Sequence, residues 1–224
     1  MPAATDSPFA RPNTAWADAG IEPVALDDDL IALNKPAGLL SVPGRGADKL
    51  DCLATRAQAV WPDALVVHRL DMATSGLMLM ARGAEMQRAL SRAFAERAVA
   101  KQYVAVVHGC LSPPQGSIDL PLSADWPNRP RQQVDKTHGK PSLTHYRVLA
   151  HDAAADTTRV VLEPVTGRSH QLRVHLQALG HPIVGDALYG TPAPHGRLLL
   201  HAMRLALRHP RHGAALRLHA APPF

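Results

Sequence analysis

The apolar positions of the chain fall into short runs, and most of these runs have the length and composition of β-strands. The runs at 65–67 and 77–80 are apolar at every position, which is typical of strands buried on both faces of a sheet. We predict strands at these apolar runs: 29–34, 38–42, 65–67, 77–80, 103–107, 143–149, 158–165, 198–207 and 216–219.

Three segments carry apolar residues at helical spacing instead, and they lie at 49–60, 84–97 and 169–179. Gly180 follows the last of them, at the position where a helix commonly ends. The strands outnumber the helices and do not alternate with them regularly. The pattern therefore predicts an α/β protein of the α+β type, with a mixed, largely antiparallel sheet and flanking helices, rather than a doubly wound parallel sheet.

The length of 224 residues is enough for one domain with a substantial core. We expect residues 1–20, which are rich in Ala and Pro, to form a loose leader and residues 21–224 to form a single domain. No apolar run approaches the roughly 20 residues of a membrane span, and the N-terminal segment lacks the apolar stretch of a signal peptide. Cys52 and Cys110 lie 58 positions apart, which disfavours a disulfide scaffold and a cysteine-based zinc site. We therefore expect a cytoplasmic protein without a membrane partner.

Charge is unevenly distributed along the chain. Residues 113–224 hold 13 of the 24 Lys and Arg residues but only 7 of the 19 Asp and Glu residues. A basic half is typical of proteins that bind a polyanion, because each neutralised phosphate releases condensed counterions. Many proteins carry such a charge without a nucleic-acid partner, so charge alone leaves the matter open. The most basic polar segment, 126–140, sets four cations against one acid: Arg129, Arg131, Lys136 and Lys140.

Several common catalytic motifs are missing. The sequence has no glycine-rich phosphate loop, no dinucleotide-binding GxGxxG after a strand, no HExxH and no GxSxG. An enzyme that depends on a nucleotide cofactor is therefore disfavoured. The histidines are weak candidates for a metal site, because His170 and His175 would point about 140° apart on a regular helix.

Two polar segments could carry chemistry. The segment 68–76 lies between two apolar strands, so Asp71 must emerge beside the sheet core, where a carboxylate needs a cationic partner to stay charged. The segment 166–175 places hydrogen-bond donors at the start of a predicted helix, where they attract anions. Each has a structural alternative, since Asp71 could cap its own turn and the helix start could be solvated. Read together, they suggest a nucleophile, Asp71, that Arg173 keeps ionised with the two donors of its guanidinium.

Tyr103 is the third candidate, and it begins an otherwise apolar strand. The simplest interpretation is core packing with the hydroxyl group at the rim of the core. The functional alternative is a ring that stacks on a nucleic-acid base. The residues by themselves do not decide between the two.

Four motifs occur in a fixed order and together identify a family. They are His68-Arg69-Leu70-Asp71 with Thr74-Ser75-Gly76; Lys101-x-Tyr103-x-Ala105-x-Val107-x-Gly109; Gly167-Arg168-Ser169-His170-Gln171-Leu172-Arg173-Val174-His175; and Gly180-His181-Pro182-Ile183-x-Gly185-Asp186. Over about residues 24 to 220, the chain strongly resembles the RluA family of RNA pseudouridine synthases. Segments 40–45, 71–76 and 125–130 are most similar to the dual-specificity type, which acts on 23S rRNA and tRNA. We accordingly expect no S4-type RNA-binding module.

The resemblance implies the pseudouridine synthase fold, with a central catalytic cleft, and an isomerase that converts uridine to pseudouridine in structured RNA. Asp71 matches the family's nucleophile, which attacks ribose C1′ or helps to eliminate the base through a glycal before the uracil rejoins through C5. Tyr103 matches the tyrosine that lies against the base and is a candidate to take the C2′ proton. Arg173 matches the arginine that pairs with the aspartate. Arg69 matches the arginine that enters the RNA stack where the target base is flipped out.

The further RNA contacts that we expect come from the two polar segments and from the basic segment: Thr74, Arg168, His170, Arg129, Arg131, Lys136 and Lys140. The implied partners are stem-loops of 23S rRNA and tRNA, with a hairpin-loop uridine and an anticodon-loop uridine as targets. An isomerisation requires no metal, redox cofactor or ATP, and we expect a monomer that uses none of them.

Two rival interpretations remain. One is a catalytically silent RNA-binding or RNA-folding protein with the same basic surface. The presence of Asp71, Tyr103 and Arg173 together argues against it, because such a protein needs no nucleophile. The other is a histidine-rich metal hydrolase, which a chelator would inactivate.

Overall fold

The structure is a computed structural model that describes residues 15–46, 49–191 and 196–224. Four α-helices and one short 3-10 helix lie in these ranges: α1 (Ala15–Asp18), α2 (Leu53–Val60), α3 (Gly83–Ala95), η2 (Trp126–Asn128) and α4 (Gln171–Ala178). None of the helices in this part of the chain has the length and apolar character that crossing a membrane requires.

The strands of the described ranges form one large sheet and one small one. The large sheet contains β1 (Pro23–Leu26), β2 (Leu30–Lys35), β3 (Ala64–Val66), β4 (Ser75–Arg82), β5 (Ala100–His108), β6 (Gln115–Asp119), β9 (Leu143–Asp152), β10 (Thr157–Pro164), β11 (Leu200–Arg208) and β12 (Ala215–His219). The small sheet pairs β7 (Leu122–Ala124) with β8 (Gln132–Val134).

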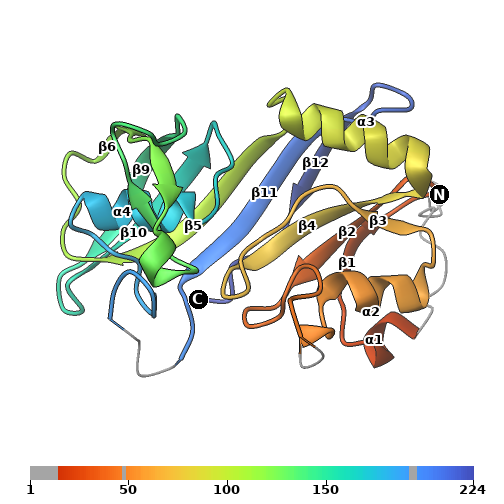
Figure 1. The fold of residues 1–224 in the computed structure, drawn as a ribbon, viewed down its shortest axis with the longest axis horizontal. Coiled ribbons are helices and arrows are strands. Elements are labelled where there is room, and N and C mark those ends of the chain that lie inside the picture. The colour runs from red at the N-terminus through yellow and green to blue at the C-terminus, as the bar shows by residue number, and fades with distance from the viewer. Residues whose placement is uncertain (1–14, 47–48, 192–195) are drawn as a thin grey trace, which may run out of the picture.

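The large sheet runs in the order β1-β2-β4-β11-β5-β10-β9-β6, with β3 paired to β4 and β12 paired to β11. Among the pairs of named strands, only β11 with β4 is parallel, at the register His201–Ser75 and Ala202–Gly76. The prediction of a mixed, largely antiparallel sheet with flanking helices is therefore confirmed. In Figure 1, β5 and β11 cross the middle of the molecule, with α4, β9 and β10 on one side and α2, α3 and β1–β4 on the other.

The core follows this division into two halves. One cluster packs α3 against the ends of β2, β4, β11 and β12, and a second packs α2 against the opposite faces of β2 and β4. A third cluster packs α4 against β5 and β10. The run at 77–80 is fully buried, as the apolar pattern predicts. The run at 65–67 is only partly buried, because β3 pairs with β4 alone and has no strand on its other side.

Some predicted boundaries are wrong, and local hydrogen bonding explains them. The helix expected from 49 begins at Leu53, because Cys52 is extended and forms a capping box with Thr55. The helix expected from 169 begins at Gln171, because His170 has left-handed backbone angles. The run at 38–42 is not a strand but a loop that makes one isolated bridge, from Leu40 to Cys52.

The last residues of the expected leader are helical. α1 begins at Ala15, and Trp16 packs against the cluster that contains α2. The rest of that prediction, for residues 1–14, lies outside the described residues. Strands β6, β7 and β8 were not predicted, because β6 and β8 are polar at most positions and β7 is only three residues long.

Gly76 lies in close contact with the neighbouring strand at the parallel junction of β4 and β11. Its φ is +110°, and a Cβ atom there would lie 2.3 Å from the carbonyl oxygen of Ala202. A methyl group cannot fit without separating two central strands. Gly83 has a similarly positive φ of +76°, but a Cβ atom added at Gly83 would have no neighbouring atom within 4 Å.

We expect Gly76→Ala to lower the free energy of unfolding by at least about 3 kcal/mol, which combines overpacking with the cost of a positive φ. Gly83→Ala is the matched control, and we expect it to cost about 1 kcal/mol, since it carries the backbone cost alone. Urea unfolding of the three proteins measures both values. Equal losses in the two variants would show that the β4–β11 junction is not tightly packed.

Candidate active site

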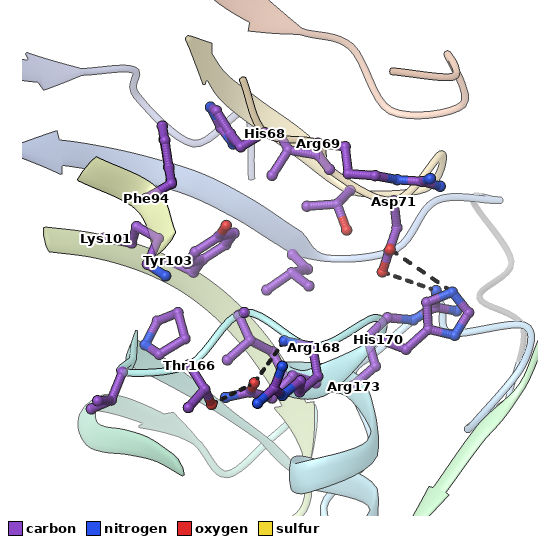
Figure 2. Close-up of a pocket in the computed structure, with 18 of the residues that line it drawn as sticks. His68, Arg69, Asp71, Phe94, Lys101, Tyr103, Thr166, Arg168, His170 and Arg173 are labelled. Carbon is purple, nitrogen blue, oxygen red and sulfur yellow. Dashed lines mark hydrogen bonds and ion pairs between the residues drawn. The ribbon is translucent and has the colours of Figure 1, made fainter. Parts of the chain in front are cut away.

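A cleft of about 490 Å³ opens between the two halves of the molecule. It is lined by the loop before β4, the end of α3, the first residues of β5 and the segment that leads into α4. Figure 2 shows Asp71, His170 and Arg173 at one end of this cleft and Tyr103, Lys101, His68 and Phe94 at the other. The structure therefore brings together the two polar segments and the tyrosine that the sequence singles out.

The loop that carries Asp71 is fixed through its main chain on both sides of the aspartate. Ser41 Oγ accepts a hydrogen bond from the Leu70 N–H at 3.0 Å and donates one to the Leu70 carbonyl at 2.7 Å. The Met72 carbonyl accepts hydrogen bonds from the Gly38 N–H and from Lys35 Nζ. The loop at 38–42, expected to be a strand, thus serves as the support of the Asp71 loop.

Lys35 is the most unusual group behind this loop, because its side chain is fully buried. Its Nζ donates to three carbonyl oxygens, those of Pro36, Leu39 and Met72, at 2.7–3.1 Å. Burial lowers the pKa of Lys35 to about 8, and the negative charge of Asp71 opposes this shift. A buried cation with carbonyl ligands therefore stands behind the candidate nucleophile, and nothing in the sequence pattern singled it out.

Arg173 uses its two-donor fork on Asp186 and not on Asp71, which corrects the geometry expected from the sequence. Its Nε and Nη2 atoms donate to the two carboxylate oxygens of Asp186 at 2.8 and 2.7 Å. The remaining Nη1 lies 3.5 Å from Asp71 Oδ2. Asp71 is one-quarter exposed, whereas the side chains of Arg173 and Asp186 are almost completely buried. The deeper carboxylate thus holds the guanidinium, and the guanidinium turns one edge toward Asp71.

Asp186 is the site residue that sequence reasoning missed. Burial alone would raise its pKa, but the hydrogen bonds and charge of Arg173, with the N–H groups of Leu188 and Tyr189, hold that pKa below its usual value. The signal was present, since Asp186 ends the last of the four motifs. No local pattern assigned it a partner, however, because its partner lies on a different element, α4.

His170 lies on the other side of Asp71. Its Nε2 is 3.8 Å from Asp71 Oδ1, and its Nδ1 is 2.6 Å from the hydroxyl oxygen of Tyr189. The left-handed backbone of His170, with φ at +53°, ends the preceding loop and turns its ring into the cleft. Burial lowers the pKa of His170, so the ring is neutral near pH 7.

Tyr103 projects from β5 into the cleft (Figure 2). Burial, together with the charge of Asp71, raises the pKa of Tyr103 well above its usual value, so the phenol keeps its proton. His68 stacks on Phe94 with ring centroids 4.3 Å apart, and its Nε2 accepts a hydrogen bond from the Leu79 N–H. Burial also lowers the pKa of His68 to about 3. This end of the cleft is therefore a wall of uncharged rings.

Cations surround the opening of the cleft. Arg69 and Arg168 line it, as expected, together with the buried Thr74. Arg97 and Lys101 also line it and were not singled out as RNA contacts from the sequence. Burial lowers the pKa of Lys101, and the nearby positive charge of Arg97 lowers it further. Such crowding of like charges favours a polyanionic ligand, which would relieve the repulsion.

The basic segment 126–140 does not line the cleft. The guanidinium of Arg129 lies over the ring of Trp126, 3.5 Å from its centroid, and that of Arg131 lies 5.4 Å from the centroid of Tyr189. Lys136 and Lys140 are exposed. The segment is tied to the site by its main chain, because the Gln132 N–H donates to the Tyr189 hydroxyl at 2.7 Å.

The histidines near the cleft are engaged in other contacts. His175 is buried, with Nδ1 2.9 Å from Thr144 Oγ1 and Nε2 3.0 Å from the Leu120 carbonyl oxygen. In the described ranges, one group has side chains close enough to share a metal ion, and its members are Asp27, Asp29 and His209. None of the three lines the cleft, and Asp29 is already paired with the guanidinium of Arg211.

Comparison with known proteins supports the same interpretation of the site. Residues 29–178 match the family model described as RNA pseudouridylate synthase. The chain is 52% identical over 201 residues to the "Dual-specificity RNA pseudouridine synthase RluA" of Escherichia coli strain K12, covering 88% of this chain and 91% of that one. It is 49% identical over 206 residues to the protein of the same name from Vibrio cholerae, covering 91% and 82%.

The fold is shared with solved structures. Human RNA Pseudouridylate Synthase Domain Containing 1 superimposes with a TM-score of 0.74 at 29% identity, over 96% of this chain and 87% of that one. Human RNA Pseudouridylate Synthase Domain Containing 4 gives a TM-score of 0.73 at 26% identity, over 94% and 93%. The chain therefore belongs to the RluA family of RNA pseudouridylate synthases and is an isomerase.

Proposed function

We propose that this protein converts uridine to pseudouridine in two kinds of RNA, at a hairpin-loop uridine of 23S rRNA and at an anticodon-loop uridine of tRNA. Relatives named as dual-specificity synthases match the chain at about half of all positions and over most of their own length, which supports this choice. The single observation that carries the proposal is the position of Asp71, which lies in a cationic cleft between a guanidinium and a wall of rings.

The cleft is suited to a flipped nucleotide. A base inside an RNA stack hides its glycosidic bond, so the target must leave the stack at a cost of a few kcal/mol. A volume of about 490 Å³ lies in the range of small-ligand pockets and is large enough for one nucleoside. In the proposal, Arg69 enters the stack in place of the base, and Thr74, Arg168 and His170 contact the flipped nucleotide.

Asp71 acts on ribose C1′ in the proposed reaction. Either its carboxylate attacks C1′ and forms a covalent intermediate, or it assists departure of the base while the sugar loses its C2′ proton to form a glycal. In both routes the C1′–N1 bond breaks, the freed uracil rotates and C5 bonds to C1′. The ester bond to Asp71 breaks in the covalent route, and C2′ regains its proton in the glycal route. C5 then loses its proton and N1 gains one, so the product is an isomer of the substrate. The protonated phenol of Tyr103 is suited to lie against the base, and its raised pKa disfavours it as the base that removes a proton at neutral pH.

The proposal is tested with the purified protein and two RNA stem-loops, one from the tRNA anticodon arm and one from the 23S rRNA hairpin. We expect pseudouridine at one uridine in each. Pseudouridine mapping of total RNA from cells with and without the gene should show the loss of both positions. Modification of one RNA class alone would overturn dual specificity but not the isomerase activity.

The first prediction from this site concerns Asp71 itself. Asp71→Asn keeps the size and shape of the side chain but removes the anionic nucleophile. We therefore expect no detectable pseudouridine, with the affinity for a tRNA stem-loop within about twofold of wild type. Turnover within tenfold of wild type would remove Asp71 from the proposed chemistry and would mean that another group supplies the nucleophile.

A second prediction concerns the edge of Arg173 that faces Asp71. Arg173→Lys keeps a cation beside Asp186 but loses the planar guanidinium, whose third nitrogen faces Asp71. We expect partial activity, measured by single-turnover pseudouridine formation.

Arg173→Ala should lose more activity and also about 3–5 kcal/mol of stability, because it leaves the buried Asp186 without a partner. A double variant, Arg173→Ala with Asp186→Ala, removes both buried charges and separates the two effects. Wild-type activity in the double variant would show that Asp71 does not depend on the guanidinium of Arg173.

The last prediction of this group is electrostatic. Lys136 is exposed and belongs to the basic segment, so we expect it to contact a phosphate. Lys136→Gln should weaken binding of all RNAs similarly and flatten the slope of log K against log salt by about 0.7 to 0.9. Arg88→Gln, on the exposed face of α3 outside the cleft, is the matched control. An unchanged slope in Lys136→Gln would place the segment away from the RNA.

A further inference from the structure

The hydroxyl group of Tyr189 lies between the basic segment and the candidate nucleophile. On one side it accepts a hydrogen bond from the main-chain N–H of Gln132 at 2.7 Å. On the other side its oxygen lies 2.6 Å from Nδ1 of His170. Beyond the imidazole ring, Nε2 of His170 lies 3.8 Å from Asp71 Oδ1. A continuous chain of polar contacts thus joins Gln132 to Asp71.

The direction of these hydrogen bonds follows from the donors available. The Gln132 N–H can only donate, so the Tyr189 oxygen accepts there and its own proton is free for His170 Nδ1. A neutral imidazole has one donor and one acceptor, and burial keeps His170 neutral near pH 7. If Nδ1 accepts from Tyr189, then the ring proton is on Nε2. This tautomer turns an N–H toward the carboxylate of Asp71, whereas the other would turn a lone pair toward it.

Charged groups also face the imidazole of His170, and they balance one another. Asp71 and Asp186 favour its protonated form, and Arg173 and Arg69 oppose it. Tyr189 is itself held firmly, because Asp186 accepts its main-chain N–H and the Arg173 guanidinium lies 5.0 Å from its ring centroid. The hydroxyl group is therefore the one neutral group that decides which ring nitrogen carries the proton.

We propose that Tyr189 is a positioning residue that fixes the tautomer of His170 toward Asp71 and couples this setting to the basic segment through Gln132. The inference rests on the proposed function, in which Asp71 is the nucleophile. Its consequence is regulatory, because RNA that contacts the segment at Arg129 or Lys136 would set the position of the Gln132 N–H. The proton on Nε2 of His170 would then be held toward Asp71 most firmly when an RNA substrate contacts both the cleft and the basic segment.

Tyr189→Phe tests the proposal, since it keeps the ring under Arg173 and removes only the hydroxyl group. We expect the single-turnover rate to fall by about three- to tenfold, the effect of losing one hydrogen bond. We also expect the acidic limb of the pH–rate profile to differ from wild type, because the neutral form of His170, which burial favours, loses the donor to its Nδ1. RNA affinity should stay within about twofold of wild type. A wild-type rate and profile would overturn the proposal.

A double-mutant cycle distinguishes positioning from simple packing. His170→Gln can present an amide N–H toward Asp71 without help from Tyr189. In that background we expect Tyr189→Phe to change the rate by less than about twofold, because the two residues act through one path. A further loss as large as in the wild-type background would show that Tyr189 acts independently of His170 and would overturn the proposal.

Tyr146→Phe is the matched control, because it removes the hydroxyl group of a buried tyrosine in the core cluster of α4 that does not line the cleft. We expect a wild-type pH profile there, and thermal unfolding of every variant checks that the fold is kept. Asp71→Asn distinguishes a failure of the role proposed for Tyr189 from a failure of the role proposed for Asp71. If Asp71→Asn is inactive and Tyr189→Phe behaves as wild type, the positioning role of Tyr189 is wrong and the proposed function stands. If Asp71→Asn stays active, the assignment of Asp71 as the nucleophile fails first, and the role of Tyr189 loses its basis with it.

Discussion

The buried ion pair between Arg173 and Asp186 is the interaction on which the rest of the cleft depends. Both side chains are almost fully removed from solvent, so each would be strongly destabilising without the other. Asp186 is further fixed by N–H groups of its own turn. The pair therefore holds α4 against the turn that carries Asp186 and leaves one guanidinium edge free. That free edge faces Asp71, which is the least buried of the three charges.

A second constraint acts from the opposite half of the molecule. Lys35 is buried at the end of β2. Its Nζ donates to the Pro36 and Leu39 carbonyls of the loop that follows it and to the Met72 carbonyl, which ties the Asp71 loop to β2. The two halves meet where β4 and β11 pair in parallel, and Gly76 allows that close approach directly after the Asp71 loop. The candidate nucleophile is thus placed by two buried cations, one on each side of the junction. Neither cation forms a two-donor ion pair with Asp71, because Arg173 pairs with Asp186 and Lys35 donates to carbonyl groups. The carboxylate of Asp71 therefore stays accessible to a substrate.

The charges of the cleft also explain why a flexible polyanion suits it. Uncharged rings from His68, Phe94 and Tyr103 form one wall, and cations surround the opening. An RNA backbone can neutralise the crowded pair Arg97 and Lys101, and a base can lie against the uncharged rings. The basic segment lies outside the cleft but is tied to it by one main-chain hydrogen bond.

The sequence by itself determined the class of sheet, the main helices and the candidates Asp71, Tyr103 and Arg173, because apolar periodicity and the family motifs are local signals. It also placed Asp71 beside the core, since a polar loop between two apolar runs can lie nowhere else. Only the tertiary structure decided which carboxylate Arg173 holds, because Asp186 comes from another element and the choice depends on burial. The roles of Lys35 and Tyr189 were hidden for the same reason. Lys35 reaches the Asp71 loop through the Met72 carbonyl, and Tyr189 reaches the basic segment through the Gln132 N–H. A carbonyl or an N–H leaves no mark in the sequence.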